Sequence, residues 1–436
     1  MNVIVPAGLL ALAATLAAQE TAPDAATAFV GARVLPVTAP PIEDGVVIVR
    51  GKTLIAVGTR DATTIPADAT RVDVAGKTIM PGLICTHSHV GGPAGADRTA
   101  PLQPECRVLD SLDVRDAGLH KARAGGLTTL NIMPGSGHLL SGQTVYVKLR
   151  RGGTIDELLI RLADGSIAGG IKMANGTNPM RKPPFPGTRA KSAALVRALF
   201  TKAQRYRDDL AAAASDPERR PARDLALEPL VEALAGRRVI HHHTHRHDDI
   251  LTVLRLAKEF GLRVVLHHVS DAVKVADEIA AAGVPCSIIV LDSPGGKIEA
   301  KDLALENGAA LERAGVATAF HTDDGITDSR VFLRMAALAV RAGMSRDKAL
   351  EGLTLVGAQI LELEDRIGSL DVGKDADLVV LSGDPFSVYT KVEQTWIEGR
   401  KVFDRSDPDD RLYAEGGDGA STPQAWYLCC FENQGN

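Results

Sequence analysis

The stretch RVIHHHTHRHDD, residues 238–249, places five of the twelve histidines of this 436-residue chain within seven positions. Its first part continues an apolar run and has the pattern of a β-strand, on which residues two apart share a face. We therefore expect His241, His243 and His245 to project from one face. The cluster is internal, is interrupted by other residues and follows an apolar run, so it is not a purification tag.

Three further apolar runs end in residues of the same kind. The residues that close them are His87 and His89, His267 and His268, and His321, Asp323 and Asp324. A lone histidine at a strand end is usually a hydrogen-bonded polar group, but four strand ends with one pattern favour a common site. Neutral imidazoles combined with a carboxylate suit Zn²⁺ or a similar divalent ion.

Runs of strand length alternate with Ala-rich helical stretches through the middle of the chain. Expected strands are 78–87, 127–134, 144–150, 168–174, 237–243, 262–268, 284–291 and 316–322, and expected helices are 112–124, 191–213, 248–260, 271–282, 302–314 and 329–342. This order fits a closed parallel (β/α)₈ TIM barrel, whose carboxyl strand ends share one rim. An open doubly wound sheet is the alternative. Residues 191–235 are expected to hold two helices.

Hairpin patterns flank this region. Short runs of alternating apolar and polar residues, broken by Gly, Pro and Asp, fill residues 28–73, and the same pattern recurs at 368–385 and 391–405. Residues after about 406 have the composition of a mobile tail.

Composition excludes several classes of protein. A net charge of −5 and 4% aromatic residues argue against a nucleic-acid surface. The apolar N-terminus, residues 3–18, suits a signal peptide spanning 1–19 better than a stable membrane span, which favours an exported protein, periplasmic or secreted. A buried first helix or strand is the alternative. The five scattered cysteines form no disulfide framework.

Several motifs together resemble the metal-dependent amidohydrolase superfamily. They are PGLICTHSH (81–89), HTDD (321–324) and GSLDVGKDADLVVL (368–381). IKMANGTNP, HTHRHDDIL and AFHTDDGITDS resemble the imidazolonepropionase-like branch. The likeness runs from about Val30 to Phe403. It implies a distorted (β/α)₈ hydrolase barrel over 79–365, a small β-sandwich from segments 28–78 and 366–405, and a tail at 406–436.

The resemblance also implies a ligand set and a reaction. The metal ligands would be His87, His89, His243, His268 and Asp323. The family hydrolyses amide, cyclic amide, peptide and related C–N bonds through a metal-bound hydroxide, with Asp323 as general base. One or two ions would bind, Zn²⁺ first, with Mn²⁺ or Co²⁺ as alternatives. His245 would polarise the substrate carbonyl or exchange roles with His243.

Lys172 lies at the end of the fourth expected strand. In many binuclear members a lysine there carries CO₂ as a carbamate that bridges two metals, and a lysine buried near metal has the neutral, reactive amine within reach. The alternative is an unmodified lysine beside a single metal. Lys148 is a weaker candidate for the same role.

Other residues near the motifs receive lesser roles. His138 is expected to contact substrate, and Arg246 would pair with a substrate carboxylate or form a surface salt bridge. His241 and His247 would lie behind the ligands or at a helix start, and Asp248 would cap the helix that follows.

Two positions depart from the family pattern. Cys85 stands where the family usually has Asp, and is either inert core or a soft neighbour of the metal. Thr177 stands where the closest branch tends to have Glu, which puts the substrate in doubt. GHLLSGQT (137–144) nearly matches a phosphate-binding loop, but Gln143 replaces the required Lys and a strand pattern follows, so nucleotide binding is not expected.

These observations favour a metal-dependent hydrolase acting on a small-molecule substrate. The alternative is an exported, non-catalytic metal- or ligand-binding barrel, against which the complete ligand set argues. The sequence leaves open whether the chain forms a homo-oligomer.

Overall fold

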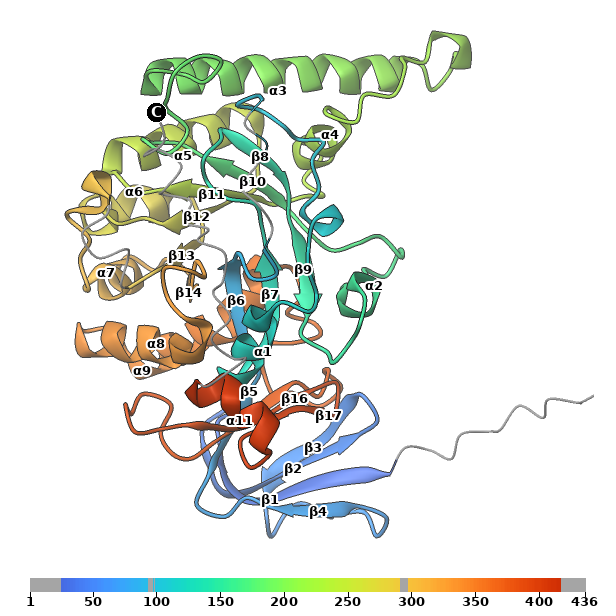
Figure 1. The fold of residues 1–436 in the computed structure, drawn as a ribbon, viewed down its shortest axis with the longest axis vertical. Coiled ribbons are helices and arrows are strands. Elements are labelled where there is room, and N and C mark those ends of the chain that lie inside the picture. Colours follow the sequence, from blue (N-terminus) through green and yellow to red (C-terminus); the bar gives the residue numbers. More distant parts are fainter. Residues whose placement is uncertain (1–24, 93–96, 98, 291–296, 417–436) are drawn as a thin grey trace, which may run out of the picture.

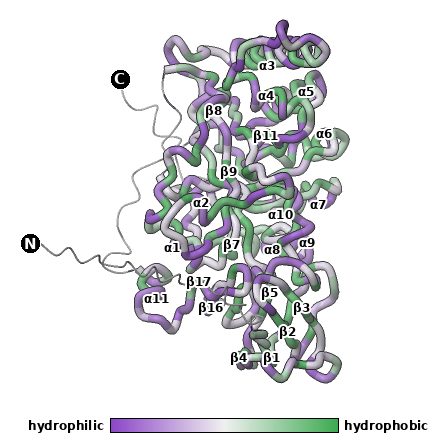
Figure 2. Tube along the Cα trace, turned by 90° about the vertical axis from the view of Figure 1, so that its right-hand side faces the viewer, coloured by the Kyte–Doolittle hydropathy of each residue, from purple (hydrophilic) through white to green (hydrophobic). Residues whose placement is uncertain are grey.

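The computed structural model describes residues 25–92, 97, 99–290 and 297–416. Its strands pair into three sheets of eight, six and three strands. Figures 1 and 2 show the eight-stranded sheet at one end of the molecule and the long helix α3 at the other. In Figure 2 the tube of α3 carries both hydrophilic and hydrophobic residues, as expected of a helix that buries one side. The expected signal peptide lies outside the described residues.

The eight-stranded sheet is built from both ends of the chain. Its order is β17-β16-β15-β5-β1-β2-β3, with β4 paired to β1. The strands are β1 (Ala26–Val34), β2 (Ile42–Arg50), β3 (Thr53–Thr59), β4 (Thr70–Asp73), β5 (Thr78–Pro81), β15 (Leu378–Leu381), β16 (Val392–Ile397) and β17 (Arg400–Asp404). Both hairpin regions thus come together as expected. Pairing gives one continuous sheet, so the expected two-layer sandwich is not confirmed.

The other two sheets carry the site. The six-stranded sheet has the order β14-β13-β12-β11-β10-β8 and the three-stranded sheet the order β6-β7-β9. The strands are β6 (Leu83–Ser88), β7 (Leu127–Ile132), β8 (Leu140–Gln143), β9 (Val145–Lys148), β10 (Ile171–Ala174), β11 (Ile240–Thr244), β12 (Val264–His268), β13 (Cys286–Ile288) and β14 (Thr318–Phe320). Strands β10 to β14 are parallel, with His243 opposite His267 in the register.

The third expected strand departs from an all-parallel barrel. It corresponds to β9, which runs antiparallel to β7, and an additional strand before it, β8, runs antiparallel to β10. Strand pairing among the described residues does not show barrel closure. Instead, the Asp323 amide donates to the His87 carbonyl at 3.1 Å and so links the segment after β14 to the end of β6. The carboxyl ends of β6 and β14 are therefore neighbours, as a common rim requires.

Helices cover the strands in the expected order. They are α1 (Ala117–Ala124), α2 (Ile155–Leu158), α3 (Arg189–Ala212), α4 (Glu228–Leu234), α5 (His247–Phe260), α6 (Ala276–Ala281), α7 (Asn307–Arg313), α8 (Phe332–Arg341), α9 (Arg346–Leu353), α10 (Leu355–Ile360) and α11 (Pro408–Glu415). Residues 191–235 hold α3 and α4, as predicted. The prediction of a mobile tail after about residue 406 is wrong for the residues of α11. Asp407 caps this helix, and Asp410 accepts from the Arg151 guanidinium at 2.6 Å. No helix in the described part of the chain is long and apolar enough to cross a membrane.

A buried charge cluster joins the eight-stranded sheet to β9. Lys148 Nζ lies 3.1 Å from Asp377 Oδ2 and 3.5 Å from Glu398 Oε1, and it also contacts Asp375. Arg150 donates to both Glu398 oxygens. Lys148 therefore binds carboxylates of the C-terminal strands, and its assignment as a carboxylated metal ligand is wrong.

Candidate metal centre

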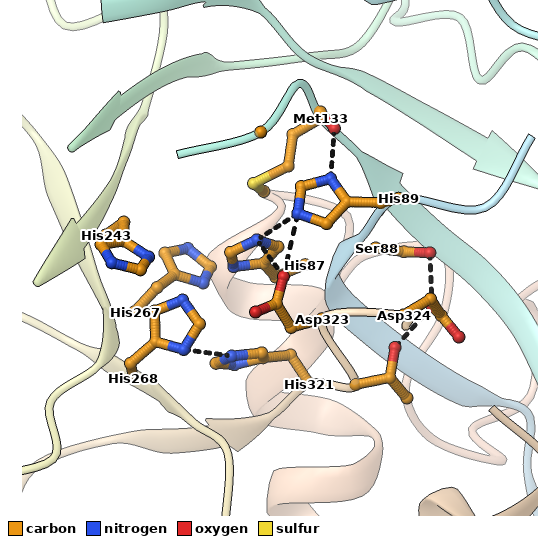
Figure 3. Close-up of polar contacts among 12 residues, drawn as sticks. His87, Ser88, His89, Met133, His243, His267, His268, His321, Asp323 and Asp324 are labelled. Atoms are coloured by element: carbon orange, nitrogen blue, oxygen red, sulfur yellow. Dashed lines mark hydrogen bonds and ion pairs between the residues drawn. The ribbon is translucent and has the colours of Figure 1, made fainter. Parts of the chain in front are cut away.

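The predicted ligand residues converge at the carboxyl ends of four strands. His87 lies on β6 with His89 just beyond it, His243 on β11, His268 at the end of β12 and Asp323 after β14. All five side chains are buried. Figure 3 shows them facing a common centre. The strand-end pattern read from the sequence thus brings its residues together in space.

Potential ligand atoms form three overlapping groups, each with its atoms within 4.8 Å of one another. The groups are His87, His268 and Asp323; His243, His245 and His268; and His87, His267 and His321. Every member is buried. Two groups share His268 and two share His87, so the arrangement has room for one or two ions.

Asp323 contributes a carboxylate to this centre. Its Oδ1 lies 2.9 Å from His89 Nε2 and 3.2 Å from His87 Nε2. Burial alone would raise the pKa of this carboxyl, but interactions with His87 and His89 outweigh burial and hold the pKa well below its ordinary value. Asp323 is therefore an anion that can accept a proton or bind a cation.

Burial favours the neutral form of several histidines of the centre. Burial, followed by the charge of Lys172, lowers the pKa of His87 well below its ordinary value. Burial also dominates the lowered pKa of His243 and His268. Burial followed by the charge of Lys172 lowers the pKa of His241 to about 3. Neutral imidazoles offer lone pairs at neutral pH, and metal binding needs them in this form.

Hydrogen bonds behind the ligands orient several rings. His89 Nδ1 lies 2.7 Å from the Met133 carbonyl, which can only accept, so Nδ1 donates there and Nε2 is turned toward the centre. His245 Nδ1 lies 2.7 Å from Ser270 Oγ. His321 Nδ1 lies 2.7 Å from Ser287 Oγ, which in turn contacts Thr86 Oγ1 at 2.6 Å.

The donor set fits a divalent cation. Among the described residues, His268 Nε2 faces this site and is buried without a hydrogen-bond partner. An unsatisfied buried polar atom costs roughly 1–3 kcal/mol, which a bound ion would remove. Imidazole nitrogens with one carboxylate are typical ligands of Zn²⁺. The residues present therefore fit the metal that the motifs imply.

Lys172 lies inside the centre. It is fully buried on β10, with Nζ 3.1 Å from His87 Nε2 and 3.1 Å from Met133 Sδ. Its position agrees with that of a ligand or of a side chain that contacts the reacting groups.

Asp324 and Cys85 lie behind the centre. The Asp324 carboxylate accepts from Ser88 Oγ at 2.7 Å and from Thr322 Oγ1 at 2.6 Å. Cys85 Sγ donates to the His87 carbonyl, and burial raises the pKa of this thiol to about 12. Cys85 is thus a protonated core residue, which favours the inert-core interpretation.

Residues with lesser expected roles lie outside the histidine groups. Arg246 forms a bidentate ion pair with Asp248 at 2.9–3.0 Å and is 41% exposed, which matches the salt-bridge alternative. The expectation that Asp248 caps α5 is wrong, because it lies in the first turn and Arg246 is the N-cap. His247 contacts Asp271, and its amide donates to the same carboxylate.

His241 and His138 are both fully buried. His241 contacts Tyr146 Oη at 2.8 Å and His267 Nε2 at 3.0 Å, behind the centre as expected. His138 packs edge-on against Phe185, with ring centroids 5.1 Å apart. The strand expected directly after GHLLSGQT is present as β9 (Val145–Lys148), and residues 140–143 within that motif form the additional strand β8.

Three residues of the centre were not assigned from the sequence. His267 and His321 end apolar runs, which was a usable signal, but neighbouring residues were chosen as ligands. Lys297 gave no signal because it follows the sequence DSPGG and ends no apolar run. Its Nζ lies 3.0 Å from His243 Nε2 and 2.8 Å from His245 Nε2.

Comparisons with known proteins agree with this geometry. The profile of the amidohydrolase family matches residues 78–402. The crystal structure of an amidohydrolase from Thermotoga maritima has a TM-score of 0.81 and 34% identity, covering 87% of this chain and 100% of that one. An imidazolonepropionase of Stenotrophomonas maltophilia is 25% identical over 78% of this chain and 86% of its own length. Amidohydrolase tasK of Hapsidospora irregularis is 27% identical over 79% of this chain, which spans only 38% of that protein.

Proposed function

The chain belongs to the amidohydrolase family, and on this premise we propose that it is a metal-dependent hydrolase that cleaves a C–N bond in a small amide, cyclic amide or dipeptide. The convergence of buried imidazole nitrogens and the Asp323 carboxylate from separate strands carries the proposal. Three groups of three ligand-type atoms are buried, each group with its atoms within 4.8 Å of one another, and a bound ion would offset the cost of burying them.

The ligands in this proposal are His87, His89, His243, His268 and Asp323, with Zn²⁺ as the first choice and Mn²⁺ or Co²⁺ as alternatives. A divalent ion there would lower the pKa of water and polarise the substrate carbonyl. Asp323 is a buried carboxylate at the centre, so it would take a proton from water at Oδ1 and deliver it to the leaving nitrogen. His245 lies beside His243 and would orient the carbonyl.

Lys172 has two candidate states within this proposal. As a free amine it would contact the reacting groups. As a carbamate, formed when the neutral amine adds to CO₂ and releases a proton, it would supply an anion between two metals. Its burial beside His87 supports the carbamate, and metal stoichiometry distinguishes the two states.

Turnover of defined substrates tests the proposed function. The metal-loaded protein is assayed on dipeptides, N-acyl amino acids and lactams, beside His87→Ala and the control His120→Ala. His120 lies on α1 and stacks on Tyr413, away from the centre. We expect turnover by the wild type and the control only. Bound metal without turnover of any compound would favour a non-catalytic binding barrel.

A further inference from the structure

Lys297 brings a cation to the proposed active site from outside the family motifs. Its Nζ lies within 3.0 Å of Nε2 of both His243 and His245, and its side chain is only 7% exposed. An ammonium can only donate, so each of these Nε2 atoms accepts from it with a lone pair. The lysine therefore donates to lone pairs that a metal would also use.

Glu299 fixes the chain beside Lys297. It belongs to the short 3₁₀ helix η4 (Ile298–Ala300), which has one turn, and its side chain is 1% exposed. Its Oε2 accepts from the Thr177 amide at 2.9 Å and lies 3.3 Å from Arg189 Nη2. Its Oε1 lies 3.9 Å from Lys297 Nζ. A carboxylate from η4 thus reaches the turn at Thr177.

Gly176 leaves the space for this contact. Its φ is +74°, and a Cβ added there would lie 2.7 Å from Glu299 Oε2. Any other residue would be strained and would push the carboxylate away. The turn after β10 is therefore shaped to receive Glu299.

We propose that Lys297 binds a substrate carboxylate separated from the scissile nitrogen by one carbon atom, and that Glu299 is the positioning residue that holds Lys297 there. The inference rests on the proposed function and narrows its substrate class to N-acyl amino acids and dipeptides. It assigns recognition of the substrate carboxylate to Lys297 at the centre and not to Arg246, which is half-exposed and paired with Asp248.

The chemistry of the metal-loaded site supports this assignment. An ion on His243 would take the Nε2 lone pair that Lys297 now contacts, so the ammonium would move aside. The flexible four-carbon stem permits the movement, while the backbone stays fixed two residues from the buried Glu299. A cation beside a metal favours an anionic ligand between the two. A carboxylate next to the scissile bond meets this requirement, whereas its methyl ester does not.

Paired substrates test the proposal. N-acetyl-L-amino acids and dipeptides are assayed as free acids and as methyl esters with the metal-loaded wild type, Lys297→Met and the control Lys301→Met. Lys301 is close in sequence, but its side chain is 70% exposed. We expect Lys297→Met to lower kcat/KM for free acids about 10- to 100-fold, mainly through KM, and to change the esters less than about threefold. The control should resemble the wild type.

Glu299 variants test the positioning role. Glu299→Ala should reproduce the selective rise in KM for free acids, and Glu299→Gln should restore much of the affinity because its amide oxygen can still accept from Thr177. Gly176→Ala should act like Glu299→Ala. A general loss of stability would instead weaken acids and esters alike.

The remaining outcomes separate this inference from the proposed function. Equal loss of kcat on acids and esters in Lys297→Met would assign the lysine to the reaction itself and overturn carboxylate binding. Wild-type preference for esters would also overturn it, while leaving the hydrolase intact. Absence of turnover on every pair together with turnover of a lactam would overturn the inference and leave the hydrolase intact, whereas absence of turnover on the lactams as well would contradict both.

Discussion

Oδ1 of Asp323 lies 2.9 Å from Nε2 of His89, so the segment after β14 meets the segment after β6 through a carboxylate and an imidazole. The two residues are 234 positions apart in the chain. Backbone pairing between the same segments, from the Asp323 amide to the His87 carbonyl, fixes the approach of the carboxylate. The proposed general base is therefore held by the same contacts that bring the strand ends together.

Replacing Asp323 by Asn should separate catalysis from folding. The substitution keeps the side-chain volume but removes the proton acceptor, so we expect kcat to fall about 10²- to 10⁴-fold. The free energy of unfolding, measured by urea denaturation of the metal-loaded protein, should change far less. Near-normal turnover in this variant would show that Asp323 is not the base.

Removal of metal should abolish activity reversibly. Dialysis against a chelator takes the ion from the imidazole and carboxylate ligands, and added Zn²⁺, Mn²⁺ or Co²⁺ should restore turnover. Metal content is measured by elemental analysis at each step. Full activity after exhaustive removal would contradict a metal-dependent mechanism.

Carbamate formation on Lys172 predicts a definite stoichiometry. We expect about two metals per chain in the wild type and loss of one or both in Lys172→Ala, because the variant lacks the bridging anion. Short-chain carboxylic acids should partly rescue its activity by replacing the carbamate. One metal per chain, unchanged in the variant, would instead indicate a mononuclear hydrolase with an unmodified lysine.

The charge cluster around Glu398 should make stability depend on acid pH. Burial opposes ionisation, but interactions with Arg150 and Lys148 outweigh it and lower the pKa of Glu398 from 4.5 to about 2. Because the folded-state pKa is depressed, this group stabilises the fold above about pH 4.5 and loses that contribution as the pH falls toward 2. Urea denaturation between pH 2.5 and 6 should show a smaller difference between wild type and Glu398→Gln at the lower pH. A constant difference would mean that Glu398 acts through packing.

We propose that the protein is exported, because its N-terminal stretch, residues 3–18, is apolar. The native protein should then begin near residue 18–20, as measured by mass spectrometry of the N-terminal peptide. An intact N-terminus on protein isolated from its source would contradict export.

Much of the fold and of the candidate site could be predicted from the sequence because local pattern decides them. Apolar runs gave the strands, and parallel neighbours place their carboxyl ends together, so His87, His243 and Asp323 meet as expected. The antiparallel direction of β9, the pairing of Lys148 with C-terminal carboxylates and the packing of α11 depend on contacts between distant segments. The position of Lys297 depends on the contact between Glu299 and the turn at Thr177, and no local sequence pattern indicates that contact.

Two side chains of the centre sit on unfavourable backbone. His268 has a φ of +71° and Asp323 a φ of +48°, in the left-handed region that residues other than glycine seldom adopt. Such a conformation costs on the order of 1–3 kcal/mol per residue and persists only where the surroundings enforce it. Selection for thermal tolerance alone would thus favour glycine at these two positions, and each gain in melting temperature would remove a group that the proposed chemistry needs. The backbone conformation of His268 and Asp323 thus serves the proposed chemistry and lowers the stability of the fold.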